Sequence, residues 1–273
     1  MKNITSRQNP AVTSYRDAAR RRTRAGPALL DGPHLLDEAL RAGVEVTSVA
    51  CTKRALETAE VAGAVERARA AGAEILLVTD EVLDAMSPAA TPAGVVALAA
   101  RRLSSTQDVF GSAAPLVVVA VDVQDPGNMG AIVRAAEAGG GTGVIACGEC
   151  ADPFGWKALR GAMGSAFRLP VAMADLEEAF AQAQRAGVAV AASVPRGGVP
   201  MYDADLVRPV ALLLGSEGPG LERAVVNRAD TAITIPMCPP IESLNVATAA
   251  AILVYEAARQ RRGATRAPAD GNR

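Results

Sequence analysis

The stretch that decides the fold is Leu116-Val-Val-Val-Ala-Val121, followed by Asp122-Val-Gln-Asp-Pro-Gly-Asn128-Met-Gly130. Six consecutive apolar residues that end at a polar, glycine-containing turn are typical of a strand buried on both faces. A second run, Val210 to Leu214, also ends at a glycine-rich turn. Strands of this kind belong to parallel sheets covered by helices, so the C-terminal half is predicted to be an α/β domain.

Strand-like and helix-like segments alternate on both sides of this stretch. The pattern predicts strands over 28–30, 46–51, 75–78, 116–121, 144–147, 188–193, 210–214 and 232–235, and helices over 33–42, 56–71, 131–138, 176–185 and 244–261. These segments indicate a small α/β domain over 1–103, a linker over 104–114, a second α/β domain over 115–262 and a disordered tail over 263–273.

The composition excludes a membrane protein and predicts a cytoplasmic one. The chain has 273 residues, 28 Lys+Arg against 29 Asp+Glu, and a net charge of −1. Its apolar runs fall far short of the roughly 18–20 residues that a membrane-spanning helix needs. The polar start, Met1 to Asn9, has no apolar segment typical of a secretory signal.

The near-zero net charge hides a basic N-terminal segment. Within the first 24 residues Asp17 is the only acid, and the cations are Lys2, Arg7, Arg16, Arg20, Arg21, Arg22 and Arg24. This excess suits a phosphate-rich partner, although a solvated helix face explains the run equally well. Tyr15 is the only aromatic residue in the run, so binding here is expected to use the nucleic-acid backbone more than the bases.

The four cysteines do not predict a disulfide framework or a metal site. Cys147 and Cys150 have the C-x-x-C spacing, but no second Cys or His pair stands near them in the sequence. We therefore expect no metal and interpret them as ordinary reduced cysteines at a strand end, with a redox or metal role as the alternative. His34, the single histidine, is interpreted as a turn residue that contacts RNA rather than as a catalytic group.

Three loops carry polar groups to predicted strand ends, where ligands collect in parallel sheets. In the first loop, Asn128 or Gly127 can cap the next helix and Arg134 follows on its first turns. The second loop, Gly215 to Gly220, encloses Glu217 between glycines, and this acid would repel a triphosphate. In the third loop, Ser243 takes the N-cap position of the closing helix and Asn245 follows it.

Taken in order, the segments Asn128 to Arg134, Leu214 to Leu221, and Ile235 to Met237 with Ser243 to Val246 resemble the three motifs of the SpoU (TrmH-like) RNA 2'-O-ribose methyltransferases of the SPOUT superfamily. The first half resembles that family's ribosomal-protein-like α/β substrate-binding domain. The resemblance implies a parallel-sheet SPOUT domain with a trefoil knot, S-adenosylmethionine as cofactor, and a homodimer with composite active sites that acts on RNA.

The resemblance also assigns roles to residues. It implies that the cofactor is held by Leu214, Gly215, Ile235, Met237 and Leu244, and that Arg134, Ser243, Asn245, Asn128 and Glu217 form the catalytic set. A guanidinium with a pKa above about 12 is a poor base. We therefore expect Arg134 to hold the RNA phosphate, with proton loss assisted by that phosphate or by Ser243, and the other three residues to orient these partners.

Other readings of the sequence remain open. Ribosomal RNA is favoured as the substrate because of the first half, with transfer RNA as the alternative. A non-catalytic RNA-binding assembly factor on the same fold is disfavoured because all five polar motif residues are present. A dinucleotide-binding oxidoreductase is disfavoured because Gly139-Gly-Gly-Thr-Gly143 follows a predicted helix and lacks the Gly-x-Gly-x-x-Gly spacing.

Overall fold

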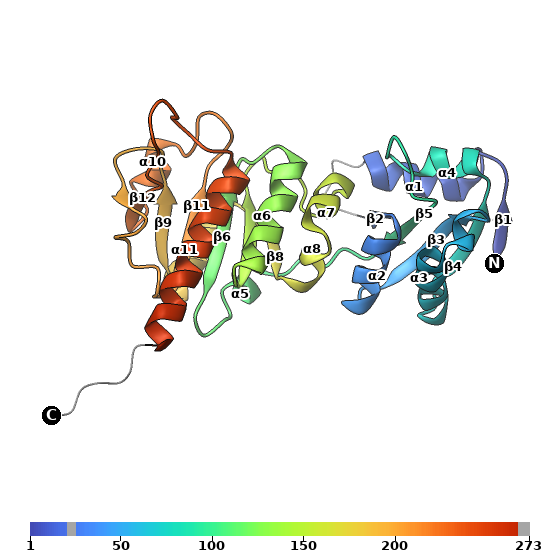
Figure 1. Cartoon of the computed structure of the whole chain (residues 1–273), viewed down its shortest axis with the longest axis horizontal. Coiled ribbons are helices and arrows are strands. Elements are labelled where there is room, and N and C mark those ends of the chain that lie inside the picture. The colour runs from blue at the N-terminus through green and yellow to red at the C-terminus, as the bar shows by residue number, and fades with distance from the viewer. Residues whose placement is uncertain (21–25, 267–273) are drawn as a thin grey trace. The chain divides into compact units, whose positions relative to one another are not determined.

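The computed structural model describes residues 1–20 and 26–266, which form two compact units (Figure 1). Unit 1 comprises residues 1–102 and 152–168, and unit 2 comprises residues 103–151 together with the chain from residue 169 onward. Arg21, Arg22 and Arg24 of the basic segment lie outside the described residues, as does the end of the predicted tail from 267. Each unit is an α/β structure with its own sheet.

Unit 2 contains a seven-stranded sheet in which every pairing is parallel, as the apolar runs predict. The strand order is β10-β12-β9-β11-β6-β7-β8. The strands are β6 (Leu116–Val121), β7 (Gly143–Cys147), β8 (Val171–Ala174), β9 (Ala189–Ser193), β10 (Val199–Pro200), β11 (Val210–Leu214) and β12 (Thr231–Thr234). All residues of β6 and β11 are buried because helices cover both faces of the sheet.

Alternate residues of these strands face the two helical layers of unit 2. Val117 and Val119 of β6 pack in a cluster with residues of α5 (Thr106–Val109) and α9 (Leu176–Arg185), and α10 (Arg223–Val226) contributes Val225 to its margin. α6 (Pro126–Ala138) and α11 (Val246–Arg266) pack against each other and against β6, in front of the sheet in Figure 1. The loops that carry the sequence motifs therefore leave a three-layer core.

Unit 1 contains a five-stranded mixed sheet of order β1-β4-β3-β5-β2. Only β5 (Val95–Ala99) is antiparallel to its neighbours. The parallel strands are β1 (Lys2–Ile4), β2 (Ala28–Asp31), β3 (Val46–Thr52) and β4 (Glu74–Val78). Helices α1 (Pro10–Arg20) and α4 (Asp80–Met86) lie on one side of the sheet, and α2 (Pro33–Arg41) and α3 (Ala59–Ala70) lie on the other (Figure 1), with the short 3-10 helix η1 (Ala55–Glu57) before α3.

Residues 152–168, which the predicted boundaries place in the second domain, belong to unit 1. They form α7 (Trp156–Ala162) and α8 (Ser165–Arg168), and α7 packs against β2, the edge strand of the five-stranded sheet. An edge strand with unpaired backbone groups needs a cover, and α7 supplies one. Arg101 and Asp152, joined at 2.6 Å, fix the start of this segment in unit 1.

Two further segments differ from their predicted form. Residues 104–114, predicted to be a linker, contain α5, and Val109 and Phe110 lie in the core of unit 2 with 0% and 4% exposure. The closing helix continues to Arg266, beyond the predicted start of the tail. The segment 104–114 lacks a long apolar run, so its order depends on tertiary contacts such as those of Val109 and Phe110, which local patterns do not reveal.

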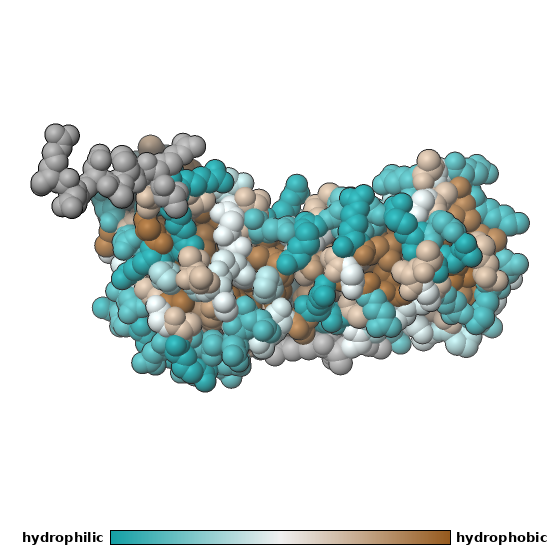
Figure 2. All heavy atoms as spheres, turned by 90° about the horizontal axis from the view of Figure 1, so that it is seen from below, coloured by the Kyte–Doolittle hydropathy of each residue, from teal (hydrophilic) through white to brown (hydrophobic). Residues whose placement is uncertain are grey.

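The surface of both units is mainly polar on the side seen in Figure 2, where apolar atoms emerge only in small groups. Within the described chain, no helix has the length and apolar character to cross a membrane.

Candidate active site

The carboxyl ends of four neighbouring strands gather the predicted motif loops at one edge of the seven-stranded sheet. In the order β12, β9, β11 and β6, these strands end at Thr234, Ser193, Leu214 and Val121. Because β11 pairs with both β6 and β9, the loop after β11 lies between the loops of its two neighbours. Sequence segments about 90 and 120 residues apart thus meet at one place, as expected for a ligand site in a parallel sheet.

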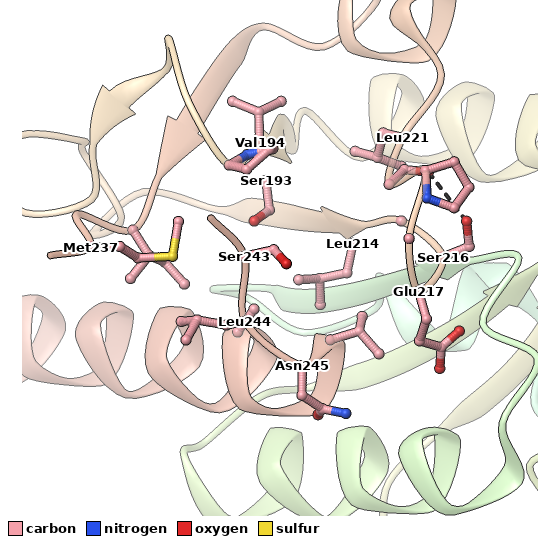
Figure 3. A pocket seen from close by; sticks show the side chains of 18 residues that line it. Ser193, Val194, Leu214, Ser216, Glu217, Leu221, Met237, Ser243, Leu244 and Asn245 are labelled. Atoms are coloured by element: carbon pink, nitrogen blue, oxygen red, sulfur yellow. Dashed lines mark hydrogen bonds between the residues drawn. The ribbon is translucent and has the colours of Figure 1, made fainter. Parts of the chain in front are cut away.

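A cavity of about 410 Å³ lies at this edge. Its walls come from the ends of β9 and β11, the loops after β11 and β12, and the start of α11. Figure 3 shows the side chains of Leu214, Met237 and Leu244 around the cavity, with Ser193 and Ser243 nearby. All five residues predicted to hold the cofactor line it: Leu214, Gly215, Ile235, Met237 and Leu244.

Glycine is required in the wall after β11 because two backbone segments of the loop approach each other closely. A Cβ atom on Gly215 would lie 2.2 Å from the carbonyl carbon of Gly220, which no side chain can tolerate without opening the loop. Gly218 and Gly220 have φ angles of 103° and 71°, which favour glycine. Ser216 donates from Oγ to the Gly220 carbonyl at 3.4 Å, which closes the loop on itself (Figure 3).

A chain of hydrogen bonds joins three of the five predicted catalytic residues. Asn128 on α6 donates from Nδ2 to Oε1 of Glu217 at 2.6 Å, and its Oδ1 accepts from Nδ2 of Asn245 at 2.9 Å. Oδ1 of Asn245 in turn accepts the backbone N–H groups of Ala247 and Thr248. In Figure 3 the Glu217 and Asn245 side chains point toward α6, away from the apolar part of the cavity. These hydrogen bonds fix the loop after β11 relative to the starts of α6 and α11.

The structure corrects both predicted helix caps. α6 begins at Pro126, five residues before its predicted start, and Asp125 caps it by accepting the Asn128 N–H at 2.8 Å, so neither Asn128 nor Gly127 is the cap. α11 begins at Val246 and Asn245 caps it, so Ser243 does not take that position. Each motif contained two capping residue types a few positions apart, and sequence alone could not choose between them. Ser243 instead lines the cavity with an exposed side chain.

Two predicted catalytic residues do not line the cavity: Asn128, which bonds to the lining residues Glu217 and Asn245, and Arg134, which bonds to none of them. Arg134 lies on α6 six residues after Asn128, which places it about 9 Å further along the helix and about 240° around it. Its side chain is exposed, and it forms no ion pair or hydrogen bond within the described part of the chain. Within one chain, therefore, the cavity and Arg134 are separate.

The last residue of β9, Ser193, and the two residues after it, Val194 and Pro195, line the cavity and were absent from the predicted set. The signal was available, because 188–193 was predicted as a strand and its carboxyl end falls at the ligand-binding edge. The loop after β9 has no glycine cluster next to the strand and was overlooked for that reason.

Cys147 and Cys150 have the environment of structural thiols. Cys147 is buried at the end of β7, and Cys150 Sγ contacts the backbone of Ala120, Val123 and Cys147. Burial raises the pKa of Cys147 to about 12 and that of Cys150 to about 11, which opposes formation of the reactive thiolate. In residues 1–20 and 26–266 no group of three or more His, Cys, Asp and Glu side chains could hold a metal ion.

The cavity suits an uncharged or cationic cofactor better than one that carries phosphates. Its size falls within the roughly 300–1,000 Å³ range of small-molecule sites. Among the described residues that line it there is no Lys, Arg or His, and Glu217 alone is ionisable. A sulfonium compound such as S-adenosylmethionine brings a positive charge and no phosphate, so the side chains fit this cofactor. Backbone groups of the glycine loop remain for polar recognition.

An enzyme with an α/β SPOUT-type domain and a glycine-lined cofactor cavity is the class that the fold and the site define. Residues 115–255 match the SpoU rRNA Methylase family, and residues 1–97 match the MRM3-like substrate binding domain. The chain therefore belongs to the SpoU rRNA Methylase family.

Individual relatives are similar over almost the whole chain. An uncharacterized tRNA/rRNA methyltransferase of Synechocystis sp. is 35% identical over 264 residues, covering 94% of this chain and 93% of the relative. The 23S rRNA (guanosine(2553)-2'-O)-methyltransferase RlmP of Bacillus subtilis is 30% identical, covering 93% and 98%. The AdoMet-bound rRNA methyltransferase from Sinorhizobium meliloti superposes with a TM-score of 0.85 at 31% identity, covering 95% and 98%.

Proposed function

We propose that this protein transfers a methyl group from S-adenosylmethionine to a ribose 2'-hydroxyl of ribosomal RNA. RNA methylation with this cofactor is the activity of the family to which the chain belongs. The observation that carries the proposal is the cavity at the carboxyl ends of β11 and β12, which the five predicted cofactor residues line and which the Glu217–Asn128–Asn245 chain borders. The relative from B. subtilis, named as a 23S rRNA 2'-O-methyltransferase, favours ribosomal RNA over transfer RNA.

S-adenosylmethionine supplies an electrophilic methyl group on a sulfonium, which leaves no covalent step for the protein itself. The side chains of the site contribute by orienting the reactants, because an in-line displacement needs the nucleophile, the methyl carbon and the leaving group to be nearly collinear. The rigid loop between Gly215 and Gly220 and the cap at Asn245 hold the cavity walls in place. Ser243 accepts a hydrogen bond from the 2'-hydroxyl or relays its proton in this proposal, which its exposed position at the cavity supports.

Arg134 holds the RNA phosphate and stabilises the developing negative charge on the 2'-oxygen. Because it lies apart from the cavity of its own chain, it acts at the cavity of a second copy in a homodimer. This arrangement makes each site composite and explains why an exposed arginine without an ion pair in the described structure stands on α6.

The outer faces of α6 and α11 are the proposed dimer contact. Tyr255 of α11 is 55% exposed, a large apolar area for a helix surface. Gly127 and Ala138, which share a face of α6 with Arg134, are small and exposed. Gly139 packs against Val254 so closely that a Cβ would approach it to 2.4 Å, which fixes the two helices as one surface. We further propose a trefoil knot, which the family resemblance implies, and a cytoplasmic location.

In vitro methylation tests the proposal. The full chain is incubated with radiolabelled S-adenosylmethionine and unmodified 23S ribosomal RNA or total transfer RNA, and the modified nucleotides are identified by mass spectrometry. We expect 2'-O-methylation of ribosomal RNA. Base methylation, or no transfer to either RNA, would contradict the proposal, and selective methylation of transfer RNA would replace its substrate. Mapping 2'-O-methyl sites in a strain that lacks the gene identifies the nucleotide.

A further inference from the structure

Residues 152–168 give unit 1 a surface that its own N-terminal sequence does not contain. The segment lies within the part of the chain that matches the SpoU methylase family, yet it is a structural component of unit 1. Phe154 is 1% exposed, and Trp156 packs against the unit 1 cluster that includes Tyr15 and Leu29. The segment also pairs Arg160 with Asp31 and Arg168 with Glu38. It is therefore held in unit 1 by several independent contacts.

The exposed side of α7 carries two cations over one aromatic ring. Nζ of Lys157 lies 5.5 Å from the centre of the Trp156 ring, and Cζ of Arg160 lies 5.8 Å from it. Arg160 is also 3.7 Å from the buried carboxylate of Asp31, which partly neutralises it. Lys157 is exposed and forms no ion pair within the described residues. The ring holds both cations at the surface of α7 without cancelling their charge.

α1 adds two more cations to the same side of unit 1. Arg16 and Arg20 lie one turn apart on α1, so they share a helix face, and both are exposed. Ala18 and Ala19 of α1 pack against the same apolar cluster as Trp156. Neither arginine forms an ion pair in the described part of the chain. The basic N-terminal segment and α7 thus flank one part of the sheet.

On the opposite side of the same sheet, the cations of α2 and α3 are paired with carboxylates. Arg41 and Arg67, on α2 and α3, both contact the carboxylate of Asp37, at 2.7 and 2.6 Å. Arg69 forms a two-point pair with Glu66. Cations on the α2/α3 side are therefore neutralised, whereas Arg16, Arg20 and Lys157 on the α1/α7 side are not. Unpaired surface cations raise the local positive potential and attract polyanions.

We propose that Arg16, Arg20 and Lys157 form a docking surface for the phosphate backbone of the substrate RNA, with Trp156 as a positioning residue for Lys157 and Arg160. The surface contacts phosphate groups rather than bases, because Trp156 is partly buried and Lys157 and Arg160 lie over its ring. The inference rests on the proposed function for the identity of the RNA. It locates the substrate-binding role of unit 1 partly on a segment from the other half of the sequence.

RNA binding by two matched triple variants of the full chain tests this surface. R16A/R20A/K157A removes the three unpaired cations, and K2A/R54A/R69A removes three exposed cations that are paired with Glu74, Asp80 and Glu66. Both change the net charge by the same amount. Filter binding to an in vitro transcribed 23S ribosomal RNA fragment is measured between 50 and 300 mM salt, with melting temperature and S-adenosylmethionine affinity as checks on folding.

We expect R16A/R20A/K157A to bind the RNA at least about tenfold more weakly, with a salt slope smaller by about 2, and the control triple to stay within about threefold. Equal weakening by both triples, or unchanged binding by R16A/R20A/K157A, would overturn the docking surface. Other outcomes distinguish failure of the proposed function from failure of the docking surface. If the wild type binds RNA through this surface but transfers no methyl group, the inference stands and the proposed activity does not. If the wild type methylates RNA and R16A/R20A/K157A does so equally at every RNA concentration, the proposed activity stands and the docking surface does not.

Discussion

Two glycines at close approaches, one in each unit, serve different purposes, and the one in unit 2 lies in the wall of the cavity after β11. A Cβ on Gly94 of unit 1 would lie 2.4 Å from the Cβ of Ala55, so this glycine lets a side chain pack against the sheet. A Cβ on Gly215 of unit 2 would instead strike backbone atoms of Gly220. Gly94 leaves room for a neighbouring side chain, whereas Gly215 lets two backbone segments of one loop approach each other. Both units are α/β structures with buried apolar strands, so the strands alone do not create a site.

The largest effect is expected in unit 2, at Arg134. Arg134→Ala should lower methyl transfer at least about 1,000-fold, because the phosphate contact and the charge stabilisation are lost together. Cofactor affinity should stay within about threefold, since Arg134 does not line the cavity of its own chain. Single-turnover methylation and calorimetry with S-adenosylmethionine measure the two quantities. An equal loss of cofactor affinity would contradict the separation between Arg134 and the cavity.

A pair of alanine substitutions, one in each unit, sharpens the comparison of glycines. Gly215→Ala must open the loop and should weaken S-adenosylmethionine binding about 100-fold or more. Gly63→Ala, inside α3, meets only the flexible end of Arg67 at 3.3 Å and should raise the free energy of unfolding by about 0.5–1 kcal/mol. Calorimetry and denaturant unfolding are the measurements. Similar cofactor affinities for the two variants would show that the loop does not form the site.

Removing a nearly buried cation from unit 1 should affect stability and not cofactor binding. Arg101 and Asp152 have side chains that are 9% and 17% exposed, and Asp152 also accepts the Phe154 N–H at 2.9 Å. Arg101→Met should lower the free energy of unfolding by about 2 kcal/mol, less than for a fully buried pair because Asp152 keeps one partner. Thermal unfolding followed by Trp156 fluorescence reports on unit 1. A tenfold change in S-adenosylmethionine affinity would contradict the division of roles.

A smaller effect is expected at the hydrogen-bonded chain beside the cavity. Glu217→Ala removes the acceptor for Asn128 and should weaken cofactor binding about tenfold, because the loop after β11 loses its contact with α6. Glu217→Gln keeps an oxygen acceptor and should restore most of the affinity. Binding isotherms for the two variants distinguish positioning from charge, and equal losses in both would assign the effect to the negative charge.

Thiol labelling tests the interpretation of the cysteines, with the smallest expected change. The raised pKa values of Cys51, Cys147 and Cys150, about 11 to 12, leave less thiolate at pH 8 than an ordinary thiol has, and Cys238 is exposed. Iodoacetamide should therefore modify Cys238 in the folded protein and spare the other three. Rapid modification of Cys147 or Cys150 by iodoacetamide, detected by mass spectrometry, would favour the redox alternative.

The strands and the ligand-binding edge of unit 2 could be predicted because their signals are local. Continuous apolar runs such as Leu116 to Val121 indicate buried parallel strands, and polar residues at their ends mark the edge where ligands bind. The five residues predicted to bind the cofactor line one cavity because they all lie at or after strand ends on that edge. The short strand β8, Val171–Ala174, was not predicted, although its four residues are apolar.

What could not be predicted depends on contacts between distant segments. The assignment of 152–168 to unit 1 follows from Trp156 packing against its core and from the Arg101–Asp152 pair, neither of which has a local signature. The choice of Asn245 over Ser243 as the cap follows from its second bond, to Asn128 on another helix. The separation of Arg134 from the cavity follows from the early start of α6 at Pro126, which places that arginine on a different face from Asn128.

Isothermal titration of the full chain with S-adenosylmethionine tests most directly the claim that the cavity after β11 is the cofactor site. We expect saturable binding at one site per chain in the wild type, and its loss in Gly215→Ala with an unchanged melting temperature. Absence of binding to the folded wild type, or undiminished binding to Gly215→Ala, would contradict it.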